Sequence, residues 1–138
     1  MDAAKALADL VEISSQIESA VLAGPDGAVL GSTLADASRS EAMAREAREL
    51  LAAAAGPAGP PSQIEVSFHE GCVFVVADGG RLVVAVTGRD PTSGLVFYDL
   101  KTCLRLSSDQ EPAAAPKAAA GGRRRKKKDE EPEAEGEA

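Results

Sequence analysis

The chain has 138 residues and a formal net charge of −7, and its composition changes abruptly after residue 106. Residues 1–106 contain all four aromatic side chains and both cysteines, whereas residues 107–138 contain no Val, Ile, Leu, Phe, Tyr or Cys. A segment without large apolar side chains cannot offset its backbone entropy by burial. We therefore predict one folded domain over residues 1–106 and a disordered tail over residues 107–138.

The charge of the predicted domain excludes several classes of protein. Residues 1–106 hold 8 basic and 14 acidic side chains, and an acidic domain does not track a phosphate backbone. No apolar run is long enough to cross a bilayer, and no basic segment leads into an apolar one at the start. Two cysteines without a CxxC motif do not make a disulfide framework. We expect a cytoplasmic protein.

The first third of the chain predicts a helix followed by a β-hairpin. Apolar residues recur at helical spacing over residues 2–16. Residues 17–23 and 28–33 alternate as strands do, and residues 24–27 between them read Gly-Pro-Asp-Gly, which favours a tight turn.

A second helix is expected where Ser38 and Glu41 fit a capping box, and Gly56 followed by proline would end it. The helix is rich in alanine, which permits close approach of another helix or sheet. Its predicted apolar stripe consists of Met43, Ala47, Leu50, Leu51 and Ala54.

The second half predicts three strands and a third helix. Residues 63–70 alternate between apolar and polar side chains, whereas residues 72–77 and 81–87 are apolar on both faces and should be central. Asp90, followed by proline, predicts the cap of a helix over residues 95–106. The order αββαβββα predicts an α/β (α+β) fold, with a five-stranded antiparallel sheet and helices on both faces.

Few residues suggest catalysis or metal binding. His69 is the single histidine; Glu65 and Ser67 share its strand face, but a half-exposed strand residue is the simpler interpretation. Cys72 and Cys103 do not match a zinc spacing, and no phosphate-binding loop occurs. We predict that the protein is not an enzyme and has no catalytic residues, no metal and no cofactor.

One strand needs a partner that the sequence does not supply. Residues 63–70 are the expected sheet edge, and an edge that carries Ile64, Val66 and Phe68 invites aggregation unless something covers it.

Two series of short motifs resemble the Roadblock family of dynein light chains and bacterial GTPase regulators. The first series is LADLV at residues 7–11 and IESAVLAGPDGAVL at residues 17–30. The second series is IEV at 64–66, FVV at 74–76, DG at 78–79, LVVAV at 82–86, GLV at 94–96 and YDL at 98–100. Each motif alone is weak, but their order and spacing together are fairly specific, and they cover residues 3–106.

The resemblance implies a homodimer in which the edge strands pair into one continuous sheet and the second helices lie side by side. The interface would then use the apolar stripe of the second helix together with Ile64, Val66 and Phe68. It also implies a non-enzymatic regulator or scaffold that binds a small Ras-like GTPase and tunes its hydrolysis or placement. Arg45 and Arg48 project from the second helix and are the candidate GTPase contacts. An arginine-finger role is one interpretation, and solvation of the helix surface beside Glu41, Glu46 and Glu49 is the simpler one.

Two alternatives remain open at this stage. The first is a small-molecule-sensing domain of the longin, profilin or PAS-like type. The second concerns the tail, where the basic run at residues 123–128 precedes an acidic run at residues 129–137. We expect the tail to be a polyampholyte without strong nucleic-acid or membrane binding, because the acidic run holds counter-charge within one Debye length of the basic run. The alternative is weak, salt-sensitive contact of the tail with a membrane or nucleic acid.

Overall fold

The computed structural model describes residues 2–108. Predictions for the tail beyond residue 108, including its basic and acidic runs, lie outside the described residues. Within them the elements follow the predicted order. They are α1 (Ala3–Ile13), β1 (Ile17–Ala23), β2 (Val29–Ser32), α2 (Ala37–Ala53), β3 (Gln63–Ser67), β4 (Cys72–Asp78), β5 (Arg81–Thr87) and α3 (Ser93–Ser108).

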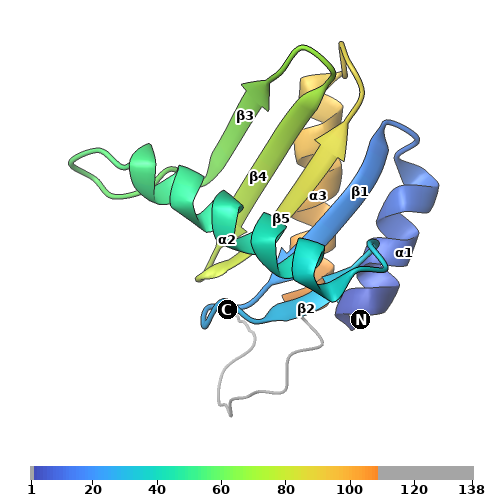
Figure 1. The fold of residues 1–138 in the computed structure, drawn as a ribbon, viewed down its shortest axis with the longest axis horizontal. Coiled ribbons are helices and arrows are strands. Elements are labelled where there is room, and N and C mark those ends of the chain that lie inside the picture. The colour runs from blue at the N-terminus through green and yellow to red at the C-terminus, as the bar shows by residue number, and fades with distance from the viewer. Residues whose placement is uncertain (1, 109–138) are drawn as a thin grey trace, which may run out of the picture. The chain divides into compact units, whose positions relative to one another are not determined.

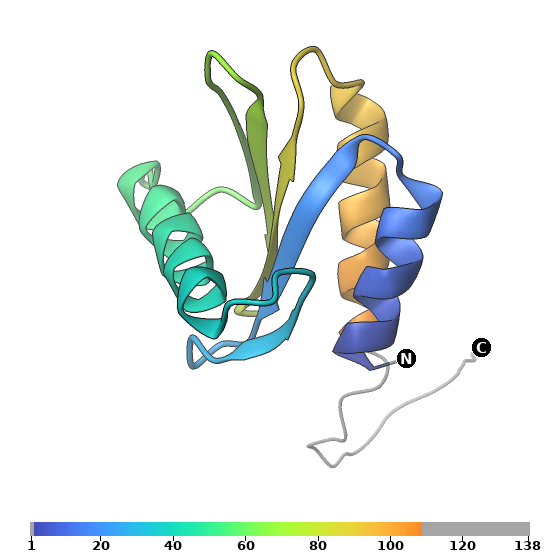
Figure 2. The same cartoon turned by 45° about the vertical axis from the view of Figure 1, so that its right-hand side comes forward.

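The five strands form one antiparallel sheet in the order β2-β1-β5-β4-β3 (Figure 1). The prediction that β3 is an edge strand is confirmed, and β2 forms the other edge. The α+β architecture with helices on both faces is also confirmed, since α1 and α3 cover one face and α2 covers the other (Figure 2).

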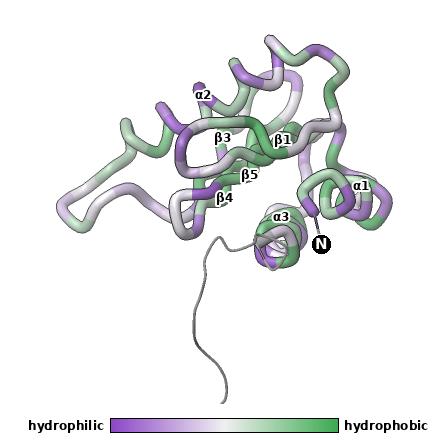
Figure 3. Tube along the Cα trace, turned by 90° about the horizontal axis from the view of Figure 1, so that it is seen from below, coloured by the Kyte–Doolittle hydropathy of each residue, from purple (hydrophilic) through white to green (hydrophobic). Residues whose placement is uncertain are grey.

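Successive side chains of a strand point to opposite faces of the sheet. Because helices cover both faces, the side chains of the central strands are buried on both sides. Phe74 and Val75 of β4 are each 0% exposed and belong to different cores. Phe74 faces α3, where its ring meets that of Phe97 edge-on with centroids 5.0 Å apart. Val75 faces α2 and pairs with Val84 of β5. The hydropathy of the trace reflects this, with β4 and β5 mainly hydrophobic between the helices (Figure 3).

The predicted cap of α2 is wrong: the capping box would make Ser38 the N-cap, but the N-cap lies two residues earlier in the chain and the helix begins at Ala37. The N-cap is Asp36, whose carboxylate accepts hydrogen bonds from the backbone N–H groups of Ser38 and Arg39. A carboxylate at this position also interacts favourably with the helix dipole. Ser40, inside the predicted capping box, is instead buried and lies 2.6 Å from the Ser32 hydroxyl of β2.

The predicted boundary of α3 also differs. Asp90 adopts a φ of 57°, in the left-handed region, and does not cap the helix. The backbone N–H groups of Leu95 and Val96 bond to the carbonyl of Thr92, and the helix begins at Ser93. At the other end α3 runs through Ser108, two residues beyond the predicted domain boundary.

Helix α1 and strand β3 are also shorter than predicted. Helix α1 ends at Ile13 instead of residue 16, because Ser14 is extended at the C-cap. The side chain of Gln16 is used elsewhere, since its Oε1 accepts a hydrogen bond of 2.6 Å from the backbone N–H of Thr92. Strand β3 stops at Ser67, so that Phe68 lies in the turn to β4.

Candidate functional site

Helix α2 crosses its face of the sheet obliquely, and its C-terminal turn, with the loop that follows, extends beyond the β3 edge (Figure 1). The predicted apolar stripe of this helix divides into two sets. Ala47 and Leu51 are buried against the sheet, with 2% and 6% exposure. Met43 and Leu50 are only half-buried, and Ala54 is exposed at the C-cap. The sheet therefore covers part of this stripe and leaves the rest accessible.

The edge strand β3 continues this accessible surface. Ile64 and Val66 pair with Val75 and Val73 of β4, and both remain half-buried. Ile64 packs against the core on the α2 side, and the two-residue period of a strand places Val66 on the same face. Phe68, just beyond the strand, is 59% exposed. These residues, with Met43, Leu50 and Ala54, form what we call the α2–β3 surface.

The two arginines predicted as GTPase contacts have different environments. The Nη2 atom of Arg48 donates hydrogen bonds of 2.8 Å to the Gly24 carbonyl and 3.3 Å to the Gly80 carbonyl. These carbonyls belong to the β1–β2 and β4–β5 turns, so Arg48 connects α2 to two turns of the sheet. Arg45 is exposed and makes no hydrogen bond or ion pair with any described residue.

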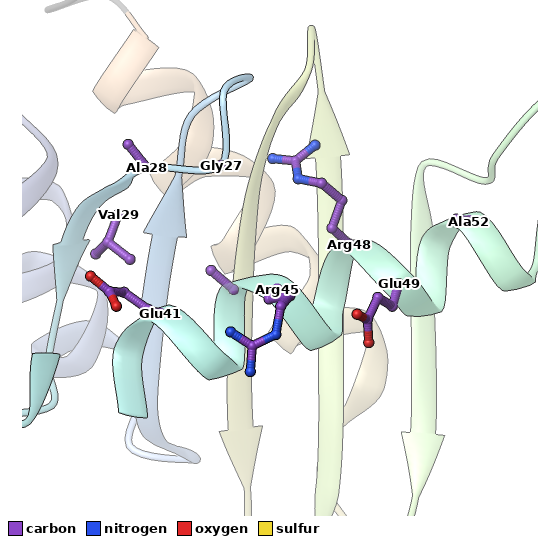
Figure 4. A pocket seen from close by; sticks show the side chains of 9 residues that line it. Gly27, Ala28, Val29, Glu41, Arg45, Arg48, Glu49 and Ala52 are labelled. Carbon is purple, nitrogen blue, oxygen red and sulfur yellow. The ribbon is translucent and has the colours of Figure 1, made fainter. Parts of the chain in front are cut away.

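An open groove runs along the flank of α2 that faces the β1–β2 turn, with a volume of about 740 Å³ (Figure 4). One wall is the turn and the start of β2. The other is α2, where Arg48 points toward the turn and Arg45 and Glu49 extend from the exposed side. The residues that line it are Gly27, Ala28, Val29, Glu41, Ala44, Arg45, Arg48, Glu49 and Ala52. A second groove of about 420 Å³ lies beyond Arg48, toward Pro60 and Asp78.

The residues considered for catalysis are not brought together. His69 is exposed, and no hydrogen bond within residues 2–108 joins it to Ser67 or Glu65. Glu65 instead accepts a hydrogen bond of 2.8 Å from the Ser93 hydroxyl, and the Ser67 hydroxyl lies 3.5 Å from the Cys72 sulfur. Among the described residues no group of three His, Cys, Asp or Glu side chains could hold a metal ion.

Both cysteines are free and buried. Burial raises the pKa of the Cys103 thiol from 9.0 to about 11, partly opposed by the nearby positive charge of Arg81. A thiol with such a pKa stays protonated near neutral pH and is a poor nucleophile. None of the helices in the described part of the chain is long and apolar enough to cross a membrane.

The arrangement of one five-stranded sheet between α2 and the α1–α3 pair is that of a Roadblock-type fold. No protein-family model and no curated protein sequence matches the chain. Solved structures do match it, and they establish the fold.

A Roadblock/LC7 domain from Streptomyces avermitilis superposes with a TM-score of 0.70 at 22% identity, over 80% of this chain and 98% of that chain. MglB from Myxococcus xanthus gives a TM-score of 0.64 at 14% identity, over 78% of this chain and 86% of that chain. Profilin IA from Acanthamoeba castellanii is less similar, with a TM-score of 0.52 at 11% identity, over 78% of this chain and 98% of that chain.

The contacts of Arg48 and Arg81 were not predicted from the sequence. Arg81 is buried, and its guanidinium donates to the Leu104 carbonyl and the Ser107 hydroxyl near the end of α3. A cation is favourable there, since helix C-termini carry partial negative charge. An arginine that opens an otherwise apolar strand is the one available signal, because such a residue needs polar partners when it is buried.

Proposed function

We propose that the protein is a non-enzymatic, homodimeric regulator or scaffold that binds a small Ras-like GTPase and modulates its GTP hydrolysis or location in the cytoplasm. The observation that carries the dimer is the α2–β3 surface. The Roadblock-type fold supports the GTPase partner, because the family that the sequence resembles includes bacterial regulators of such GTPases.

The proposed dimer joins two β3 edges into one sheet. Strand β3 has one unpaired edge, and an unpaired edge with half-buried apolar side chains on one face is a template for a second strand. A two-fold axis beside β3 would bring the overhanging end of α2 over the partner's sheet and bury Met43 and Leu50. Ala47 and Leu51 would support this interface from beneath. A stable interface of this kind buries about 800 Å² per partner.

For the GTPase contact we propose Arg45 as the residue that a partner meets first. Its guanidinium is exposed and unengaged within the described residues, whereas that of Arg48 already bonds two turn carbonyls. Arg48 would then contribute by holding α2 in place against the sheet, with a direct contact as its secondary role. Arg45 would face an acidic group of the partner, so that reversing its charge would set like charges against each other and weaken the complex.

Native mass spectrometry with the small Ras-like GTPases of the same genome tests this proposal. We expect one of them to form a complex with the dimer, and Arg45→Glu to weaken that complex about tenfold, equivalent to about 1.4 kcal/mol. Lys101→Glu is the matched control, because Lys101 is also an exposed cation but lies on α3. The proposal fails if none of the GTPases binds, or if Lys101→Glu weakens binding as much as Arg45→Glu.

A further inference from the structure

The groove beside α2 lies on the flank opposite the proposed dimer contact. Successive residues of a helix are about 100° apart around its axis, which sets Ala44, Arg48 and Ala52 on one side of the buried face and Met43 and Leu50 on the other. A homodimer built through the α2–β3 surface would therefore leave the groove accessible. The groove, unlike that surface, has no role in the proposed dimer.

The wall of the groove has two parallel rows of side chains. The inner row consists of Ala44, Arg48 and Ala52. The two alanine side chains on either side of the arginine are small, so a ligand can approach the helix backbone closely there. The outer row is Glu41, Arg45 and Glu49, all exposed. No ion pair within residues 2–108 involves any member of the outer row, so all three charges can meet a partner.

The outer row has a regular charge pattern. Residues four apart on a helix are separated by about 6 Å along the axis, so the rim presents negative, positive and negative charge at about 6 Å intervals. A second helix lying along the groove would place its own side chains at the same intervals. Its charges would match the rim if they were positive, negative and positive at four-residue spacing.

A second copy of α2 does not fit this rim. With a two-fold axis at Arg45, antiparallel α2 helices would set Arg45 against Arg45 and Glu41 against Glu49 of the other copy. Like charges at such distances destabilise a contact. The pattern therefore disfavours self-association through this flank.

We propose that the groove between α2 and the β1–β2 turn is a docking site for an α-helix of another protein, with basic, acidic and basic residues at four-residue spacing beside small apolar side chains. The apolar residues would pack on Val29 and Ala52, and the three charges would pair with Glu41, Arg45 and Glu49. This site goes beyond GTPase binding, since any partner with such a helix would fit it.

The test uses the full chain and two synthetic helical peptides, each of 17 residues and alanine-rich with leucine on one face. One peptide carries Lys, Glu and Lys at four-residue spacing, and the other carries Glu, Lys and Glu. Fluorescence anisotropy at low salt should give about tenfold tighter binding of the Lys-Glu-Lys peptide, the gain expected for three exposed ion pairs. The triple variant Glu41→Lys, Arg45→Glu, Glu49→Lys should reverse this preference.

Two further variants control the experiment. Exchanging the Lys5 and Asp9 charges reverses an ion pair of 3.0 Å on α1 and should leave both affinities unchanged. Ala52→Trp places a large side chain in the groove from an exposed position and should weaken binding of the Lys-Glu-Lys peptide at least tenfold. This variant tests the groove even if the triple variant does not fold. The proposal is wrong if neither peptide binds, if both bind equally, or if Ala52→Trp has no effect. The experiment contains no GTPase, so its failure leaves the GTPase proposal standing.

Discussion

The two faces of the sheet are covered differently. On the face covered by α1 and α3, large side chains such as Phe74, Leu10 and Leu100 fill the core. On the other face, α2 contributes only Ala44, Ala47 and Leu51 to the buried core. Two helices close the first face. On the second face a single alanine-rich helix leaves Met43, Leu50 and the apolar side chains of β3 partly accessible. The comparison suggests that the first face mainly stabilises the domain, and that the second retains apolar surface for other molecules.

The largest expected effect is on the closed face. Phe74→Ala should destabilise the domain by about 3–5 kcal/mol, because the cavity lies between the sheet and α3 and cannot collapse. Val75→Ala, at the adjacent fully buried position on the α2 face, should cost only about 2 kcal/mol, since it removes two methyl groups. Urea unfolding measures both. Equal losses would show that the two cores are equally important to stability.

A smaller effect on the closed face depends on pH. The pKa of Cys103 is raised to about 11 in the folded state, above its ordinary value of 9.0. The protonated thiol therefore contributes fully to the free energy of unfolding below pH 9. This contribution, about 2–3 kcal/mol, is lost as the pH rises toward 11. Unfolding free energies at pH 8 and pH 10.5 should show this loss, and Cys103→Ala should reduce it. An equally steep loss in Cys103→Ala would assign the pH dependence to other groups.

The smallest expected effect compares two arginines on α2. Arg48→Ala removes two hydrogen bonds to turn carbonyls and should cost about 1 kcal/mol. Arg45→Ala, on the exposed side of the helix, should change the unfolding free energy by less than about 0.5 kcal/mol. If the two variants are equally stable in thermal or urea unfolding, the contacts of Arg48 with Gly24 and Gly80 do not stabilise α2.

Much of the fold could be predicted because it depends on local patterns. The alternation in β3, the continuous apolar runs of β4 and β5 and the turn at residues 78–80 determined both the order of elements and the edge strand. Helix ends were less predictable, since two side chains could cap α2. Asp36 and Ser38 are both good N-caps, and in the structure Asp36 caps the helix while Ser40 of α2 lies against Ser32 of β2.

The candidate site was harder to predict because α2 is rich in alanine. Ala44 is buried and Ala53 is exposed, yet nothing local distinguishes them; only the rotation of the helix against the sheet does. The sequence therefore grouped Ala47 and Leu51 with the accessible residues. The contacts of Arg48 were also beyond local reasoning, since they join residues 24 and 32 positions apart in the chain.

The most direct test of the account is the oligomeric state of the protein measured by sedimentation equilibrium at tens of micromolar. We predict a homodimer for the wild-type chain and a folded monomer, or a precipitate, for Val66→Lys, which places a charge on the inward face of the β3 edge. Leu30→Lys, at a partly exposed apolar residue on the opposite edge strand, should remain dimeric. A monomeric wild type, or a Val66→Lys variant that stays dimeric, would contradict the role that we assign to the α2–β3 surface.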